Sequence, residues 1–245
     1  MANQFERTAL ILGEAALERL SRARVAVFGL GGVGGYVVEG LVRAGVGNFV
    51  IVDNDVITKS NLNRQILALH STLGQAKTEV AQKRIQDINP ACRVEAHKTF
   101  VLPENADSFH FDTYDYVVDA VDTLTAKLCL AACAKRAGTP IISCMGTGNK
   151  TQAEFVITDI YQTHTDPLAR VMRKELKKRG IDSLKVLYSP QKGTRPAAEA
   201  LERVMRAEQA EGSVRRDVPG SISTVPSVAG LMIAGEVIKD LLANS

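Results

Sequence analysis

The residues best suited to chemistry begin at a glycine-rich turn in the first part of the chain. Gly29, Gly31 and Gly34 fit the spacing Gly-x-Gly-x-x-Gly, and Gly32 lies among them. Such glycines allow a tight turn and let phosphate groups approach backbone N–H groups at the start of a helix. Asp53 follows at the end of the next predicted strand, where an acidic residue can bind ribose hydroxyls. This pattern alone predicts a nucleotide site, most often for NAD or FAD.

The next stretch, VDNDVITKSNLNRQ at residues 52–65, carries more polar groups than a dinucleotide needs. Its members beyond Asp53 are Asp55, Asn61, Asn63, Arg64 and Gln65. Lys77 follows on the first turn of the next predicted helix. Hydride transfer requires neither this arginine nor this lysine, so the stretch argues against a dehydrogenase.

Asp122 closes the fourth predicted strand, and ligands bind at the carboxyl ends of the strands in a parallel sheet. If a carboxylate attacks the α-phosphate of ATP, both reactants are anions and cations must neutralise them. Arg64 and Lys77 supply cations, and Asp122 can hold Mg²⁺ to a phosphate oxygen. The ordered set therefore predicts ATP as a substrate that is attacked at phosphorus.

Strands alternate with helices over the first 146 residues. Short apolar runs predict strands at 24–30, 48–53, 92–98, 114–122 and 139–146. Helices are predicted at 33–44, 74–89 and 123–137. This order predicts an α/β, Rossmann-like fold, which is a mainly parallel twisted sheet with helices on both faces.

The second part of the chain is less regular. Strands are predicted at 152–160 and 184–189, helices at 166–180, 197–210 and 228–243, and loops at 191–196 and 211–227. Gly230 and Gly235 predict close packing of the last helix, within the chain or across a subunit interface. Because there is no repeat or low-complexity linker, we expect a single domain over 1–245, with a C-terminal extension packed on the same sheet.

Composition and cysteine usage narrow the class of protein. The 245 residues are 45% hydrophobic and 23% charged, which is typical of a globular chain. No apolar run reaches 18 residues, and acidic side chains interrupt the first twenty, so we expect a cytoplasmic protein with no membrane span. The four cysteines form no Cys-x-x-Cys pair, so we expect no four-thiolate zinc site.

Positive charge is concentrated in the C-terminal third. Residues 170–216 hold thirteen Lys and Arg against six Asp and Glu, a net +7 in a chain whose total is +3. Such an excess suits a polyanionic partner, although a solvated basic helix would look the same. The basic residues concerned are Arg170, Arg173, Lys174, Lys177, Lys178, Arg179, Arg215 and Arg216.

Four motifs in residues 1–160, namely GLGGVG, VDNDVITKSNLNRQ, LGQAKTEV and DAVDT, resemble the ubiquitin-activating-type adenylyltransferase superfamily that includes the ThiF and MoeB proteins. The resemblance implies that the glycine loop and either Asp53 or Asp55 bind ATP. It implies further that Asn63, Arg64 and Lys77 hold the phosphates and that Asp122 binds Mg²⁺. Arg7, in the segment FERTALILGEAAL at 5–17, would enter the partner subunit's site in a homodimer.

Over nearly its whole length the chain resembles one branch of this superfamily, the bacterial tRNA threonylcarbamoyladenosine dehydratases. The similarity includes INPACRV at 88–94, the run from TDI to LKKRG at 158–180, and the basic loop at 211–220. The resemblance implies a ligase-type reaction beside the tRNA anticodon, in which the threonyl carboxylate is adenylated and then closes onto the urea-like group. Residues 1–160 would form the ATP-binding core. Residues 161–245 would bind the tRNA backbone and support the dimer.

Other interpretations of the sequence stay open. The chain could instead adenylate the C-terminal glycine of a ubiquitin-like sulphur-carrier protein, although ThiF and MoeB proteins generally carry two Cys-x-x-Cys motifs that this chain lacks. A scaffold that binds ATP without turnover is a third interpretation, and the intact Arg64, Lys77 and Asp122 argue against it. A sulphur-transfer or sulphur-carrier protein also stays open as a further partner.

The chain departs from this branch at one thiol. Some members carry a cysteine in the region 217–220, proposed to receive the acyl group, and here that region reads Asp217-Val218-Pro219-Gly220. Cys144 ends a predicted strand near the expected site, but we interpret it as a core residue. We expect no enzyme-bound thioester, because the attacking nitrogen belongs to the substrate and adenylation alone makes the carbonyl labile. Whether the chain catalyses the second step or only the first stays open.

Overall fold

The computed structural model describes residues 4–210 and 218–243, which form one seven-stranded sheet in the order β3-β2-β1-β4-β5-β7-β6. The strands are β1 (Arg24–Phe28), β2 (Asn48–Val52), β3 (Arg93–His97), β4 (Tyr116–Asp119), β5 (Ile141–Cys144), β6 (Val156–Asp159) and β7 (Lys185–Tyr188). β6 is antiparallel to β7, and every other neighbouring pair is parallel. The predicted Rossmann-like fold is confirmed.

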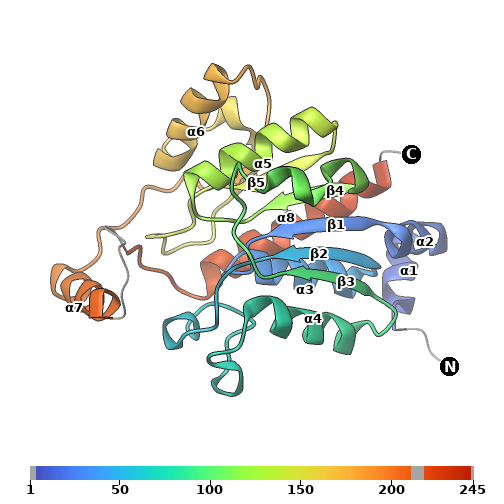
Figure 1. The fold of residues 1–245 in the computed structure, drawn as a ribbon, viewed down its shortest axis with the longest axis horizontal. Helices are drawn as coiled ribbons and strands as arrows, with labels where there is room; N and C mark the ends of the chain where they lie inside the picture. Colours follow the sequence, from blue (N-terminus) through green and yellow to red (C-terminus); the bar gives the residue numbers. More distant parts are fainter. Residues whose placement is uncertain (1–3, 211–217, 244–245) are drawn as a thin grey trace.

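Helices cover both faces of the sheet (Figure 1). They are α1 (Glu6–Leu12), α2 (Glu14–Arg22), α3 (Gly34–Ala44), α4 (Lys77–Ile88), α5 (Leu124–Ala137), α6 (Pro167–Lys178), α7 (Ala198–Ala210) and α8 (Thr224–Ala243). α3, α4 and α8 pack on one face, whereas α5 and α6 pack on the other. Because both faces are covered, the five inner strands are mostly buried, whereas the outer strands β3 and β6 are exposed or half-buried.

β1 shows how the sequence produces this burial. Val25 and Val27 belong to the core beneath α3 and α8, whereas Ala26 and Phe28 belong to the core beneath α5. Successive side chains of a strand point to opposite faces, so a strand with two covered faces needs a continuous apolar run. RVAVF at 24–28 is such a run.

α8 joins the C-terminal extension to the helix that follows the glycine loop. A Cβ at Gly230 would lie 2.5 Å from the carbonyl oxygen of Val33, and one at Gly40 would lie 2.8 Å from the Ala234 Cβ. Glycine therefore allows α3 and α8 to approach closely. A Cβ at Gly235 would meet nothing within 4 Å in the described chain, so Gly230 packs closely within the subunit, and close packing at Gly235 across a subunit interface stays a prediction.

Several predicted boundaries differ from the structure by one to four residues, and three of them have a clear physical reason. β4 ends at Asp119 rather than at residue 122, because its partner β1 ends at Phe28 and the chain there turns into the glycine loop. β6 covers Val156–Asp159 rather than 152–160, because the partner strand offers only Lys185–Tyr188. α8 begins at Thr224 rather than at residue 228, with a proline in its first turn, where a missing N–H costs nothing.

None of the helices in the described ranges is both long and apolar enough to cross a bilayer. α7 projects from the body of the molecule at the side where the strands end (Figure 1). The predicted loop at 211–227 is described only from residue 218 onward, and residues 218–223 precede α8 without regular structure.

Candidate active site

The glycine loop lies where the strand order of the sheet reverses. β1 pairs with β2 on one side and with β4 on the other, and ligands bind in the crevice at such a switch point. Gly29 has φ +89°, and a Cβ there would lie 2.6 Å from the carbonyl oxygen of Ala120, so only glycine fits. The Leu30 N–H, in the same loop, donates to Asp53 Oδ2 at 2.6 Å. Asp53 therefore braces the loop from the end of β2.

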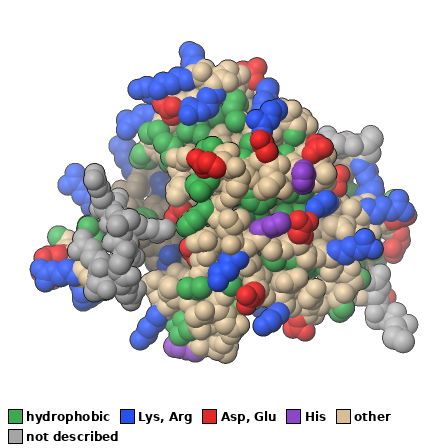
Figure 2. Space-filling model, in the orientation of Figure 1, with side chains coloured by type: hydrophobic (Ala, Val, Ile, Leu, Met, Phe, Trp, Pro, Cys, Tyr) green, Lys and Arg blue, Asp and Glu red, His purple; other side chains and the backbone are tan. Residues whose placement is uncertain are grey.

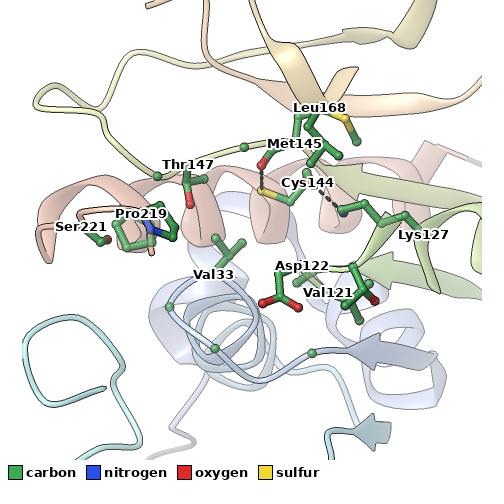
Figure 3. Close-up of a pocket in the computed structure, with 18 of the residues that line it drawn as sticks. Val33, Val121, Asp122, Lys127, Cys144, Met145, Thr147, Leu168, Pro219 and Ser221 are labelled. Atoms are coloured by element: carbon green, nitrogen blue, oxygen red, sulfur yellow. Dashed lines mark hydrogen bonds between the residues drawn. The ribbon is translucent and has the colours of Figure 1, made fainter. Parts of the chain in front are cut away.

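A cavity of about 590 Å³ opens beside this loop (Figure 3). Most of the predicted nucleotide-site residues line it. Those that line it are Gly29, Gly31, Gly32, Asp53, Asp55, Asn61, Arg64, Gln65, Lys77 and Asp122. Gly34 and Asn63 lie next to lining residues and do not line the cavity themselves. Arg7 also lies outside it, because α1 is at the opposite end of the sheet (Figure 1).

Two carboxylates and a lysine form the charged side of the cavity. Lys77, the first residue of α4, is 4% exposed, and its Nζ lies 2.7 Å from Asp55 Oδ2 and 3.6 Å from Asp53 Oδ2. Burial raises the pKa of Asp53, while Lys77 and the N–H groups of Leu30 and Asp55 oppose this rise. Asp53 is thus a buried brace, whereas the Asp55 side chain is half-exposed and pairs with the lysine.

Arg64 is held at the cavity edge by acceptors close to it in the chain. Its Nη1 donates to the carbonyl oxygen of Ser60 at 2.8 Å and to Asn63 Oδ1 at 2.9 Å. The Asn63 side-chain amide donates to the carbonyl oxygen of Ser221 at 3.0 Å. Asn63 therefore links the arginine to the segment that precedes α8.

Gln65 offers an acceptor that the described chain does not use. The residue is 8% exposed, and its Oε1 is buried without a hydrogen-bond partner among residues 4–210 and 218–243. A buried amide oxygen without a donor is costly. Gln65 lines the cavity beside Gly31, and the side-chain nitrogen Nε2 is the end that lies toward that glycine.

Asp122 lies three residues beyond β4, with its carboxylate pointing into the cavity (Figure 3). Its loop is tied to the strand end, because the Val121 N–H donates to Asp119 Oδ1 at 3.2 Å. Mg²⁺ is commonly bound by one or two carboxylates together with substrate phosphates. The position of Asp122 across from the glycine loop fits that arrangement.

A buried ion pair beneath the cavity was not predicted from the sequence. Lys127 Nζ lies 3.1 Å from both oxygens of Asp119, and it donates to the Cys144 carbonyl oxygen at 2.6 Å and to Ser143 Oγ at 3.3 Å. Both charged side chains are 1% exposed. The pair joins the ends of β4 and β5 under the Asp122 loop.

Cys144 lines the cavity but is suited to packing. Burial raises the pKa of its thiol to about 12, so the thiol stays protonated near neutral pH. The interpretation of Cys144 as a core residue therefore agrees with its surroundings.

The other half of the cavity was also missed by sequence reasoning. It is lined by Met145, Gly146, Thr147, Gly148, Asn149, Lys150, Asp166, Pro167, Leu168, Val218, Pro219 and Ser221. The sequence signal that could have located this half is GTGN at 146–149, which predicts a turn directly after a strand. Since the nucleotide-site residues lie on the glycine-loop side, this half has room for the group that reacts with the nucleotide.

The fold and site define an α/β nucleotide-binding protein whose cavity places an arginine, a lysine and a carboxylate beside a glycine loop. The chain belongs to the ThiF family, which it matches over residues 3–244.

Two relatives that match nearly the whole chain carry the same protein name. The tRNA threonylcarbamoyladenosine dehydratase of Bacillus subtilis is 42% identical over 247 residues, covering 100% of this chain and 96% of that protein. The Escherichia coli K12 protein of the same description is 33% identical over 257 residues, covering 99% and 94%. The crystal structure of the E. coli enzyme in complex with ATP has a TM-score of 0.85 at 31% identity, covering 98% of this chain and 94% of that one.

A second kind of relative matches only part of the chain. The sulfur carrier protein adenylyltransferase of Thermus thermophilus is 41% identical over 131 residues, which is 54% of this chain and 48% of that protein.

The buried pair yields a prediction about stability. Lys127→Met removes the ammonium group but leaves Asp119 charged and buried, so the free energy of unfolding should fall by about 3–5 kcal/mol. Urea denaturation followed by circular dichroism measures this loss. Lys135→Met is the matched control on α5. Because Lys135 is 56% exposed, the urea midpoint of this variant should stay close to that of the wild type. Equal urea midpoints for the two variants would show that the Asp119–Lys127 pair does not stabilise the fold.

Proposed function

We propose that this protein uses ATP to dehydrate N6-threonylcarbamoyladenosine in tRNA, by adenylation followed by cyclisation. The observation that carries the proposal is the convergence of Arg64, Lys77 and Asp122 on one cavity beside the glycine loop. The full-length similarity to enzymes of that description supports the choice of substrate. We infer a single domain, with 1–160 as the ATP-binding core and 161–245 binding tRNA and supporting a dimer, and we expect it in the cytoplasm.

In the first step, a carboxylate oxygen of the substrate attacks the α-phosphorus, and pyrophosphate leaves. Arg64 and Lys77 would neutralise the phosphates, and Asp122 would hold a Mg²⁺ ion, whose positive charge would offset that of the phosphate oxygens. In the second step, a nitrogen of the urea-like group attacks the acyl carbon, and AMP leaves with the former carboxylate oxygen. The net change in the nucleoside is the loss of one water.

The exposed face of α6 supports tRNA binding. α6 begins at the cavity wall with Pro167 and Leu168, and Figure 2 shows Lys and Arg gathered over this region. Arg170, Lys174 and Lys177 are exposed there. Because α6 begins at the cavity wall, a tRNA backbone bound along this helix would bring the modified base to the cavity.

Other predicted basic residues are engaged within the protein. Arg173 donates to the Thr163 carbonyl oxygen at 2.9 Å, and Lys178 and Arg179 both pair with Glu175. Arg215 and Arg216 lie outside the described residues. These five residues stay proposals as tRNA contacts. The first test uses Arg170, Lys174 and Lys177, because all three are exposed.

A homodimer would complete the site. Leu10 and Ile11 on α1 are each 85% exposed, and α1 buries none of its residues in this chain. Exposed apolar side chains at one end of a molecule favour a partner surface. In such a dimer Arg7, which is exposed on the same helix, would enter the partner's cavity and contact the phosphates.

The first experiment is mass spectrometry of threonylcarbamoyl-modified tRNA incubated with the protein, ATP and Mg²⁺. The modified nucleoside should lose one water, with release of one AMP per product. Lys77→Ala should lower the rate by about 100-fold or more, since it removes a cation from the phosphates. Lys83→Ala, an exposed lysine on the same helix, is the control and should react at the wild-type rate.

The same experiment separates the alternative reaction. If the nucleoside keeps its mass, and ATP–pyrophosphate exchange appears only with a small protein that ends in Gly-Gly, the chain is a carrier-protein adenylyltransferase. The partial similarity to such an enzyme is the observation that keeps this second candidate.

Removing charge from α6 should weaken tRNA binding and make it less sensitive to salt. In an Arg170→Gln, Lys174→Gln, Lys177→Gln variant, the slope of log affinity against log salt should fall by about 2–3, roughly one for each lost phosphate contact. Filter binding at several salt concentrations measures the slope. A control with Arg22, Lys83 and Lys239 changed to Gln loses the same charge elsewhere and should bind like wild type. Matching slopes for both variants would remove α6 from the tRNA site.

Subunit mixing tests the role of Arg7. Arg7→Ala and Lys77→Ala proteins should each be inactive, because each lacks one cation at every site. After subunit exchange, heterodimers contain one intact site, so an equal mixture should recover about a quarter of wild-type activity. Dehydrated nucleoside per minute is the readout. No recovery in mixtures shown to exchange would place Arg7 outside the partner's site.

A further inference from the structure

One wall of the cavity is a short segment that hydrogen-bonds to two asparagines, Asn149 and Asn63. Val218, Pro219 and Ser221 line the cavity, and Figure 3 shows Pro219 and Ser221 beside Thr147. The Gly220 N–H donates to Asn149 Oδ1 at 2.7 Å. The Asn149 N–H donates back to the Gly220 carbonyl oxygen at 2.8 Å. Residues 218–221, here called the wall segment, are therefore bonded to the turn after β5 by a reciprocal pair.

The backbone of Asn149 has the left-handed conformation that this pairing uses. Its φ is +58°, a region that asparagine tolerates better than most residues. Its carbonyl oxygen accepts from the Thr194 N–H at 2.7 Å. Three segments that are far apart in the sequence thus meet at one residue.

The wall segment fits closely at both ends. A Cβ at Gly148 would lie 2.6 Å from the Pro219 Cβ, so glycine is needed for the approach. At the other end, the Ser221 carbonyl oxygen accepts from Asn63, which also bonds to Arg64. The wall segment therefore spans the cavity from Asn149 to the arginine that is proposed to contact phosphate.

The wall segment can exclude water from the reacting groups. This inference rests on the proposed function. The acyl-adenylate can lose AMP in two ways: to the substrate nitrogen, which closes the ring, or to water, which restores the carboxylate and wastes the ATP. Excluding water from a site suppresses such side reactions. Pro219 places an apolar side chain where the wall faces the cavity.

We propose that Asn149 is a positioning residue that holds the wall segment over the acyl-adenylate, so that AMP release is coupled to ring closure. The hydrogen bond that the Gly220 N–H donates to Oδ1 is the contact that the Asn149 side chain itself makes with the wall segment. The backbone bonds around it depend on the left-handed conformation, which glycine also adopts.

The test is the ratio of AMP to dehydrated nucleoside, measured in one reaction with modified tRNA, ATP and Mg²⁺. Asn149→Gly keeps the backbone conformation and removes Oδ1, so the ratio should rise roughly threefold to tenfold, the effect of losing one hydrogen bond. Asn149→Asp keeps an acceptor oxygen and tolerance of positive φ, so the ratio should stay near that of wild type. His110→Gly is the control, because His110 is exposed, has φ +46° and lies away from the cavity.

The outcomes separate this inference from the proposed function. AMP without dehydrated nucleoside in the wild type would count against the function, whereas equal ratios in wild type and Asn149→Gly would overturn the inference. Hydrogen exchange over residues 218–223 tests the contact without tRNA. Faster exchange in Asn149→Gly but not in Asn149→Asp supports it, and equal exchange in all three proteins overturns it.

Discussion

The buried ion pair of Asp119 and Lys127 fixes the floor of the cavity, and the geometry of the site depends on it. Two charges removed from water are costly unless both are paired and fully hydrogen-bonded. Lys127 meets this condition by directing its donors at Asp119, Ser143 and the Cys144 carbonyl oxygen. Because these partners end β4 and β5, the pair determines where the Asp122 loop and the turn at 146–149 leave the sheet.

The cations above this floor are held by neighbours within the chain. Lys77 pairs with Asp55, and Arg64 donates to the Ser60 carbonyl oxygen and to Asn63. Both side chains are therefore positioned in advance, which reduces the ordering cost of binding. A triphosphate would replace one anion by another at Lys77, and the half-exposed Asp55 can turn toward water as it is displaced. Asp53 cannot do the same, because it is buried and holds the glycine loop.

The sequence predicted the parts of the site that depend on local patterns. Glycine spacing, apolar strands and the polar run at 52–65 each follow from neighbouring residues, so the fold and the phosphate side were predictable. The Asp119–Lys127 pair was not, because sheet topology brings its members to Ser143, and a lysine in TLTAKLC looks like a surface residue. Asp122 was placed on a strand because the apolar pattern continues past the point where β1 ends. The part played by Asn149 depends on a contact 71 positions away along the chain.

The absence of cysteine at 217–220 changes what the site must control. A covalent acyl-enzyme protects a reactive carbonyl by moving it to a thiol. Cys144 is poorly suited to this role, because it is 4% exposed and burial raises the pKa of its thiol to about 12. Ring closure needs no second reactant, because its nucleophile is already attached to the acyl group and has a high effective concentration. Water, as the solvent, is then the competitor that would divert the acyl-adenylate to free carboxylate and AMP. Without an acyl-enzyme, the selectivity of the reaction depends on the walls that exclude water, and not on a nucleophile of the protein.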